Sequence, residues 1–331
     1  MTWESPVLDI PAPWRRAAAR IAARGWRKVL VIGASDRGKS SFCRFLARHL
    51  TQAGYCVAFV DADVGQKDVG PPATVSLARA GPDGEFTAAE ALYFVGAVSP
   101  MAHFASLVIG TRRLVDAAAA EFVLIDTTGL VHGRGAALKA LKIEALRPDA
   151  VVLLERGEEL APIVRAHRHL DLLRLQPSPA ARRKSDPARR QAREAAFRSY
   201  FAGAARRVLG LDRLVMQRSL LFTGEAVEDD RFLHAERVGD ELLGITAGQH
   251  CSHEGGLRVI PAHFADQLLC GLADRHGDCL GLGLIEGIDF RGGALSLLTP
   301  LPQQRIRVLQ FGDLHLSRDG RELRHGRLCP F

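Results

Sequence analysis

The fold of this chain is decided by residues 33–40, which read Gly33-Ala34-Ser35-Asp36-Arg37-Gly38-Lys39-Ser40. This stretch satisfies the pattern G-x-x-x-x-G-K-[ST] at every position. The glycines of the pattern let successive backbone N–H groups point at a β-phosphate. Lys39 would reach the β- and γ-phosphate oxygens, and the Ser40 hydroxyl would coordinate Mg²⁺. We therefore predict that these residues, together with Ser41, bind a nucleotide.

The surroundings of this loop indicate a parallel sheet covered by helices. Residues 42–50 carry apolar side chains at helical spacing, and Ala53-Gly54 ends that pattern. Short apolar runs recur along the chain at Val29–Ile32, Val57–Val60, Phe122–Ile125 and Ala150–Leu154. Buried strands that alternate with helices are typical of a sheet with helices on both faces. We predict the α/β fold of a P-loop NTPase over residues 28–210, preceded by a helical segment at residues 1–27.

The last third of the chain has a different character. Short strand-like runs follow one another with glycine and proline between them and little helix, at Leu220–Phe222, Leu257–Ile260, Leu280–Ile285, Ala294–Leu298 and Arg305–Phe311. We predict a smaller β-rich domain over residues 211–331. The polar and basic segment Ser178–Arg190, which contains two prolines, is predicted to be mobile.

Composition excludes several classes of protein. The chain has 331 residues, of which 47% are hydrophobic and 24% charged; these values do not fit collagen, a coiled coil or wholesale disorder. No apolar run approaches the roughly 18 to 20 residues that span a bilayer, and no secretory signal is visible, so we expect no membrane association. Six cysteines without a C-x-x-C pair favour reduced thiols and a cytoplasmic location. Residues 250–253 contain two histidines and a cysteine, but no second pair lies at zinc-site spacing.

Positive charge is concentrated in one part of the sequence. Residues 161–210 contain twelve Arg or Lys and three Asp or Glu, a net charge of +9, whereas the whole chain carries +7. A basic block of this kind is typical of a protein that binds a polyanion. The alternative is a solvated helical face in a chain that favours arginine, and the charge alone does not separate the two.

Carboxylates follow two of the predicted strands. Asp61 and Asp63 come after Val57–Val60, and Asp126 comes after Phe122–Ile125. These positions lie at the carboxyl edge of a parallel sheet, where ligands bind. One carboxylate can hold Mg²⁺ while another accepts a proton from an attacking hydroxyl. Asp61 could instead be a strand-end cap without a chemical role. Asp126-Thr-Thr-Gly129 is similar to a GTPase switch, but the guanine-reading Asn-Lys-x-Asp motif is missing.

Several motifs in one order resemble those of the polynucleotide 5′-hydroxyl kinases. They are the phosphate loop, Asp61–Gln66 followed by Pro71–Thr74, Asp126–Gly129 followed by Gly133 and Gly135, and the basic stretch that ends at Tyr200-Phe201. The family includes the RNA kinase of the eukaryotic pre-mRNA cleavage complex and the ribosomal-RNA-processing kinase. The resemblance covers residues 28–210 and, more weakly, Leu280–Phe290 and the residues from Gly312. It implies ATP-dependent phosphorylation of the 5′-OH end of RNA or single-stranded DNA, with Mg²⁺.

The resemblance also implies roles for individual residues. Lys39, Asp63, Lys184, Arg189 and Arg193 would be catalytic, with Asp63 activating the 5′-hydroxyl and the basic residues closing as a lid over the phosphoryl group, at about residues 178–198. Ser40 and Asp126 would hold Mg²⁺. The acceptor strand would be bound by Gln66, Ser99, His103, Leu130 and Arg190, of which Ser99 and His103 belong to a clasp.

The chain departs from the eukaryotic pattern in three places. Leu130 stands where a base-stacking tryptophan is found, Lys184 stands where an arginine is usual, and Pro72-Ala73 replaces Pro-Gly. We expect this chain to lack the domain that precedes the kinase core in eukaryotic members, and Trp14 or Trp26 could then stack on the adenine instead.

Three functions remain open on the sequence alone. The first is the polynucleotide kinase. The second is a catalytically weak nucleotide-binding assembly factor in a nucleic-acid-processing complex, which the substitutions at Leu130 and Lys184 would suit. The third, a small-molecule kinase, is disfavoured because such an acceptor needs no basic block. The choice between RNA and DNA, the oligomeric state and the protein partners are not specified by the sequence.

Overall fold

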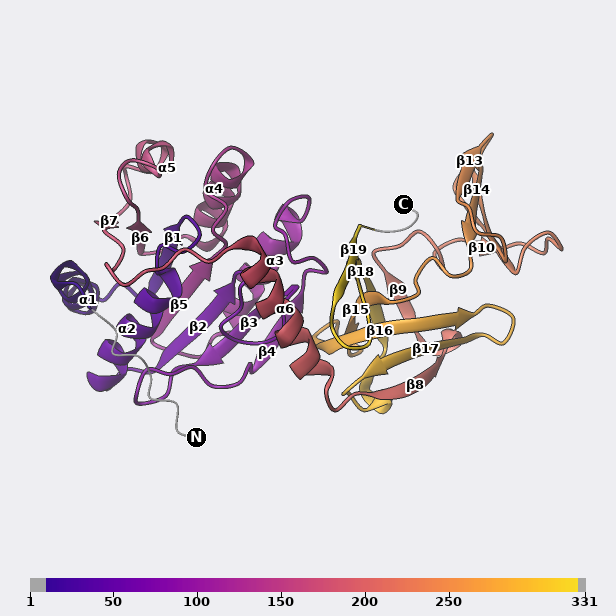
Figure 1. Ribbon diagram of the computed structural model, residues 1–331, viewed down its shortest axis with the longest axis horizontal. Coiled ribbons are helices and arrows are strands. Elements are labelled where there is room, and N and C mark those ends of the chain that lie inside the picture. The colour runs from indigo at the N-terminus through magenta and orange to yellow at the C-terminus, as the bar shows by residue number, and fades with distance from the viewer. Residues whose placement is uncertain (1–9, 327–331) are drawn as a thin grey trace. The chain divides into compact units, whose positions relative to one another are not determined.

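The computed structural model describes residues 10–326, which form two compact units (Figure 1). The first unit extends to Val95 and includes Ser99–Arg189; the second contains Gly96–Val98 and the residues from Arg190 onward. Residues 1–9 of the predicted N-terminal segment and residues 327–331 of the predicted C-terminal domain, with Cys329, lie outside the described residues.

The first unit is an α/β layered structure, as predicted. Its strands lie in the order β4 (Ala91–Phe94), β3 (Thr74–Arg79), β2 (Val57–Ala62), β5 (Phe122–Thr127), β1 (Lys28–Gly33), β6 (Ala150–Leu154) and β7 (Leu172–Leu175). The strands from β2 to β7 in this order are parallel. β3 and β4 extend the sheet in antiparallel pairing, which makes it mixed.

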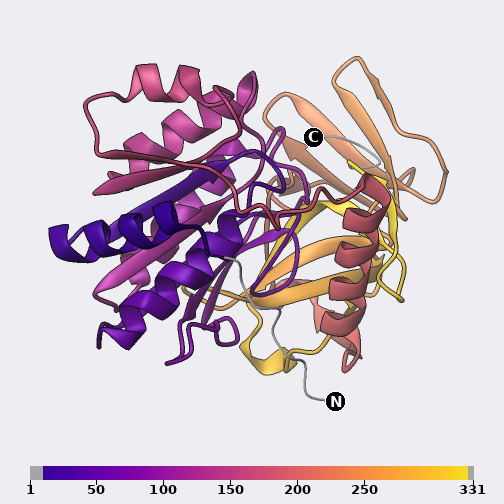
Figure 2. The same ribbon diagram turned by 60° about the vertical axis from the view of Figure 1, so that its left-hand side comes forward.

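Helices cover both faces of this sheet (Figures 1 and 2). On one face lie α1 (Ala12–Arg24) and α2 (Lys39–Gln52), and on the other α3 (Phe104–Ala117), α4 (Arg134–Leu146) and α5 (Ala161–Ala166). Side chains of β1 alternate between the two cores: Val29 and Val31 pack with α1 and α2, while Leu30 and Ile32 pack with the other helices. An apolar strand buried on both faces is thus explained by period-2 alternation between two helical layers.

The boundary between the units lies inside α6 (Asp186–Phe201), at Arg189 and Arg190. It precedes residue 210, the boundary expected from the sequence, because β8 (Ala205–Gly210) pairs with β17 (Ala294–Thr299) of the second unit. Part of the segment predicted to be mobile is helical, since α6 starts at Asp186 with Pro187 directly after it. An acidic residue and a proline in the first turn both suit a helix start.

The second unit is β-rich, as predicted. One sheet has the order β19 (Glu322–His325), β18 (Val308–Leu316), β15 (Leu268–Ala273), β16 (Cys279–Asp289), β17 and β8, and β9 (Val215–Gln217) pairs with β18. A second sheet has the order β10 (Glu225–Ala226), β11 (His234–Val238), β12 (Glu241–Thr246), β14 (Leu257–Pro261) and β13 (Ser252–Glu254). Short 3₁₀ turns lie at Leu211–Arg213 and Gln303–Arg305.

Two expectations about this unit are wrong. Leu220–Phe222 is a turn and not a strand: Leu221 is buried in the core, Phe222 has a positive φ of 68°, and the Phe222 N–H donates to the Glu236 carboxylate. Leu221 packs in the core of the unit and Phe222 packs against it, whereas Leu220 is exposed. Cys251 is disulfide-bonded, whereas Cys43, Cys56, Cys270 and Cys279 are free thiols. The lack of a C-x-x-C pair does not exclude a bond between cysteines far apart in sequence.

No helix within residues 10–326 is long and apolar enough to cross a membrane.

Candidate active site

The phosphate loop connects β1 to α2, as its sequence predicts. Gly33 lies so close to β6 that an added Cβ would stand 2.6 Å from the Leu154 carbonyl oxygen. Gly38, with φ of 80°, directly precedes α2. The Lys39 side chain is buried, and its Nζ donates to the Ala34 carbonyl at 3.2 Å, which brings the ammonium group back over the loop. The loop therefore has the curled backbone, the helix N-terminus and the cation that suit a polyphosphate.

Two oxygen ligands that suit Mg²⁺ meet beside this loop. The Ser40 hydroxyl donates to Asp126 Oδ2 at 2.6 Å. The other carboxylate oxygen, Oδ1, accepts from the Thr127 N–H at 2.7 Å, which fixes the carboxylate at the end of β5. A hydroxyl and a carboxylate are hard donors of the kind Mg²⁺ binds together with phosphate oxygens. Burial raises the pKa of Asp126 to about 7, and a bound cation would favour its ionised form.

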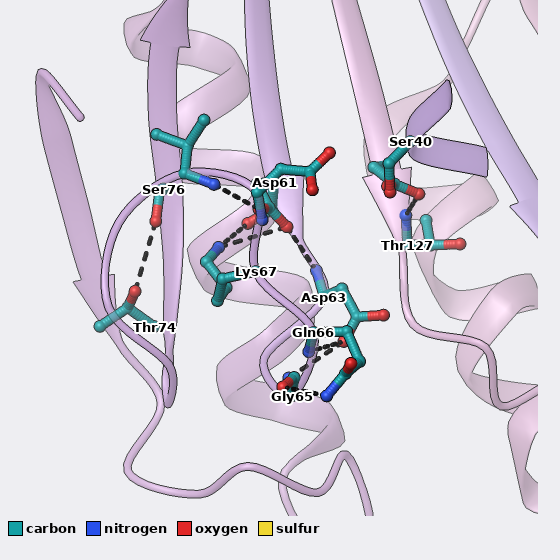
Figure 3. A network of polar contacts seen from close by, with 12 residues as sticks. Ser40, Asp61, Asp63, Gly65, Gln66, Lys67, Thr74, Ser76 and Thr127 are labelled. Atoms are coloured by element: carbon teal, nitrogen blue, oxygen red, sulfur yellow. Dashed lines mark hydrogen bonds and ion pairs between the residues drawn. The ribbon is translucent and has the colours of Figure 1, made fainter. Parts of the chain in front are cut away.

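Asp61, near the end of β2, and Asp63, just after it, have different surroundings (Figure 3). Asp61 is 1% exposed and accepts from four donors: the N–H groups of residues 63, 68 and 69, at 3.1, 2.8 and 3.1 Å, and Lys67 Nζ at 3.3 Å. Asp63 is only partly buried, and its Oδ1 accepts from the N–H groups of Gly65 and Gln66, both at 3.0 Å. Within residues 10–326, hydrogen bonds occupy both oxygens of Asp61 but one oxygen of Asp63.

The loop that follows β5 lies against the phosphate loop. An added Cβ at Gly129 would stand 2.6 Å from the backbone nitrogen of Ser35. At Gly135 it would stand 2.6 Å from the backbone of Leu130, so the start of α4 fixes the chain at that residue. Gly129 and Gly135 are thus explained by close approach of backbones, whereas Gly133 has no such neighbour but a positive φ of 53°. Leu130 itself is partly exposed.

Lys184 and Arg189 of the basic lid also contact the phosphate loop. Asp36 Oδ2 accepts from the main-chain N–H of Lys184 at 3.0 Å and from the Arg189 guanidinium. Gln66 Nε2 donates to the Arg189 carbonyl at 3.3 Å. Arg37, the next loop residue, forms two hydrogen bonds with Glu159, at 2.6 and 2.7 Å. This pairing raises the pKa of Arg37 and lowers that of Glu159.

The remaining candidate residues are divided between the two units. Arg193 belongs to the second unit, where its guanidinium pairs with the Glu322 carboxylate at 2.6 Å. Arg190, in the same unit, pairs with Glu194 at 3.0 Å. Ser99 and His103 lie in the first unit, in the turn that leads into α3. The Ser99 hydroxyl accepts from the Met101 N–H at 3.3 Å.

Comparisons with known proteins show the family of the chain. A family model described as mRNA cleavage and polyadenylation factor CLP1 P-loop matches residues 33–203. The polyribonucleotide 5′-hydroxyl-kinase PF0112 of Pyrococcus furiosus is 36% identical over 96% of each chain.

The chain belongs to the CLP1 P-loop family.

Further relatives show the same assignment with less identity. Polyribonucleotide 5′-hydroxyl-kinase MJ1315 of Methanocaldococcus jannaschii is 31% identical over 89% of each chain. Clp1 of Xenopus laevis, another polyribonucleotide 5′-hydroxyl-kinase, is 28% identical over 87% of this chain and 70% of its own. The fold is similar to that of Clp1p in a solved Clp1p–Pcf11p complex, with a TM-score of 0.62, 14% identity, and coverage of 91% of this chain and 78% of that one.

The two tryptophans considered for adenine stacking are parts of the core in this family member. Trp14 is completely buried, its Nε1 donates to the Gln176 carbonyl at 2.9 Å, and its ring meets Phe42 edge-on at 5.2 Å. Trp26 is 8% exposed, with the Arg20 guanidinium 5.3 Å from its ring centre. Trp14 therefore has no free face for adenine. Its ring packs against Gly38 and would stand 3.6 Å from a Cβ added at that glycine.

Sequence reasoning missed two buried lysines on α4. Lys139 is fully buried, and its Nζ donates to the Thr128 carbonyl and hydroxyl at 2.5 and 3.1 Å, which ties α4 to the loop after β5. Lys142 is also fully buried, and its Nζ has no hydrogen-bond partner within the described part of the chain. Both share a helix face with Leu138, Ile143 and Leu146. The signal in the sequence was that both lysines stand at positions where the helical spacing of apolar residues predicts buried side chains.

Burial lowers the pKa of Lys142 to about 8, against the attraction of Asp63 and Asp126. Below pH 8 the lysine is charged in both the folded and the unfolded state, so the folded state bears the full desolvation cost. Between about pH 8 and 10.5 the folded lysine loses its proton first, which relieves that cost. We predict that Lys142→Met raises the melting temperature at pH 7 by about 2 to 6 °C, and by less at pH 9.5.

Thermal unfolding followed by circular dichroism at the two pH values measures this effect. Lys28→Met is the matched control, because Lys28 is partly exposed and its Nζ donates to the Leu146 carbonyl at 3.0 Å; it should give no gain. A lower melting temperature for Lys142→Met at pH 7 would mean that the attraction of Asp63 and Asp126 exceeds the desolvation cost.

Proposed function

We propose that this chain is an ATP-dependent polynucleotide 5′-hydroxyl kinase, which transfers the γ-phosphate of ATP to the 5′-OH end of RNA or single-stranded DNA. The observation that carries the proposal is the convergence of the phosphate loop, the Ser40–Asp126 pair and Arg189 in one unit. The Pyrococcus furiosus kinase aligns with this chain over 96% of its length, which supports the same reaction.

The chain's own residues divide the work of the reaction. The loop backbone and Lys39 would bind the β- and γ-phosphate oxygens of ATP, and Ser40 with Asp126 would hold Mg²⁺. Mg²⁺ would offset negative charge on the β- and γ-oxygens. The free oxygen of Asp63 accepts the proton of the 5′-hydroxyl as its oxygen attacks the γ-phosphorus. The bond from that phosphorus to the β–γ bridging oxygen breaks, and ADP leaves. Arg189 stabilises charge on the phosphoryl oxygens.

The lid suits a nucleic-acid acceptor. Arg182 and Arg183, just before the Asp36 contact, are exposed. Exposed guanidinium groups on the lid could pair with backbone phosphates of a strand whose 5′-OH enters the site. The net charge of +9 over residues 161–210 is more than a nucleoside or sugar acceptor would need.

A label-transfer assay tests the proposal directly. Purified protein, Mg²⁺ and γ-labelled ATP are incubated with RNA and single-stranded DNA that carry 5′-OH ends, and with 5′-phosphorylated strands as a control. We expect label on the 5′-OH strands alone. Lys39→Ala should lower transfer by at least about 10²-fold, because its ammonium group contacts the transferred phosphate. ATP binding without transfer to either strand would contradict the kinase and favour the nucleotide-binding assembly factor.

A second prediction distinguishes Asp61, near the end of β2, from Asp63, just after it. Asp63→Asn should retain ATP affinity and the wild-type melting temperature. Its kcat should fall about 10²- to 10⁴-fold, because the amide cannot take up a proton. Asp61→Asn should lower the melting temperature, because it weakens the acceptor for four donors in one loop. Measured kcat, ATP affinity and melting temperature separate the two effects. Full turnover by Asp63→Asn would move the base to another group.

Salt dependence tests the nature of the acceptor. If several backbone phosphates are bound, kcat/KM for a 20-nucleotide strand should fall steeply as the salt concentration rises. In a plot of log kcat/KM against log salt concentration, each phosphate contacted should make the slope more negative by about 0.7. A dinucleotide with a 5′-OH end, which offers one phosphate, is the matched control and should show a shallow slope. Equal slopes for the two acceptors would argue against strand binding.

A further inference from the structure

Asp36 has a backbone conformation that most side chains avoid. It lies in the variable part of the phosphate loop with a φ of 61°, in the left-handed region that favours glycine. Asp and Asn are tolerated there better than other residues. The position therefore admits glycine or a short polar side chain, and the chain has a carboxylate there.

That carboxylate is a poor neighbour for a polyphosphate unless its charge is balanced. Arg37, beside it, is already paired with Glu159. Asp36 is balanced by the Arg189 guanidinium, and both side chains are largely buried, at 14% and 20% exposed. The direct ion pair that balances Asp36 therefore comes from the lid, and Arg37 of the loop adds only a longer-range attraction.

The same carboxylate fixes the position of the lid. Its Oδ2 binds the main-chain N–H of Lys184 as well as Arg189, so residues on both sides of the α6 start are attached to one atom. Gln66, from the loop after β2, holds the Arg189 carbonyl at 3.3 Å. Lys184 and Arg189 of the lid are thus attached to two loops. One is the phosphate loop, which would bind ATP, and the other is the loop after β2, which carries the proposed proton acceptor Asp63.

We propose that Asp36 is a positioning residue that docks the lid on the phosphate loop and places Arg189 beside the γ-phosphate site. The inference rests on the proposed kinase reaction, in which Arg189 faces the transferred phosphoryl group. A guanidinium group has five N–H donors, so Arg189 can keep one on Asp36 and direct others at phosphate oxygens. Lid docking and nucleotide binding are then coupled, because an undocked lid leaves Asp36 charged and unbalanced within the loop.

The variants are chosen to fit the backbone. Asp36→Gly removes both lid contacts and suits the positive φ. Asp36→Asn keeps an acceptor for the Lys184 N–H but loses the charge. The matched control is Asp186→Asn, since Asp186 also pairs with Arg189, at 3.6 Å, but its side chain is 95% exposed.

The first measurement needs neither ATP nor a polynucleotide. Limited trypsin digestion of the full chain, followed by mass spectrometry, gives the rate of cleavage after residues 182–184. We expect Asp36→Gly to raise this rate about fivefold or more, Asp36→Asn to raise it less, and Asp186→Asn to leave it unchanged. An unchanged rate in Asp36→Gly would overturn the proposal.

The second measurement is a double-mutant comparison of ATP affinity. Arg189→Ala should weaken ATP binding about tenfold, partly because Asp36 is left unbalanced. Adding Asp36→Asn should return the affinity to within about threefold of the wild type. Additive losses in the double variant would overturn the coupling.

A third readout, the number of ATP molecules hydrolysed per phosphate transferred, should rise in Asp36→Gly because a detached lid admits water. An unchanged ratio would contradict the docking role. If the wild type transfers no phosphate but trypsin cleavage and ATP affinity respond as stated, the docking role stands and the kinase proposal fails.

Discussion

The arrangement of this site depends on the close approach of backbones at the carboxyl edge of the parallel sheet. Gly33 lies against the Leu154 carbonyl, and Gly129 lies against the Ser35 nitrogen. A side chain at either position would separate loops that must share one phosphate group. Because these glycines have no side chain, the ends of β1, β5 and β6 come together, and Ser40 reaches Asp126 at 2.6 Å.

The second constraint is the pairing of charge among buried side chains. Asp61 and Asp126 are 1% and 2% exposed, and Lys39, Lys139 and Lys142 are also buried. Burial disfavours the charged form of each group, which is why the pKa of Asp126 rises and those of the buried lysines on α4 fall. Four hydrogen-bond and ion-pair donors compensate Asp61 for its loss of hydration. These contacts also order the loop that carries Asp63. The division of labour between the two aspartates follows from their hydrogen bonds.

The sequence predicted the first unit well because its signals are local. The phosphate-loop pattern, the four apolar runs and the helical period at residues 42–50 each fall within a few residues. It failed where a residue's environment is set by distant parts of the chain. Leu220–Phe222 has strand-like side chains, but a distant carboxylate, Glu236, holds it as a turn. The Asp36–Arg189 contact joins residues 153 positions apart, and no pattern in either segment indicates the other.

The departures from the eukaryotic pattern have different consequences in this structure. Lys184 contacts Asp36 through its main-chain N–H, which any residue except proline supplies. The change from arginine to lysine therefore leaves this anchor intact and removes at most one guanidinium from the lid. Leu130 is different, because Gly135 fixes its backbone while its side chain is partly exposed, and a leucine cannot offer a base the face of an indole ring. In the proposed kinase reaction, acceptor binding would then depend more on backbone phosphates than on stacking at that position, and an arginine-rich lid suits such contacts.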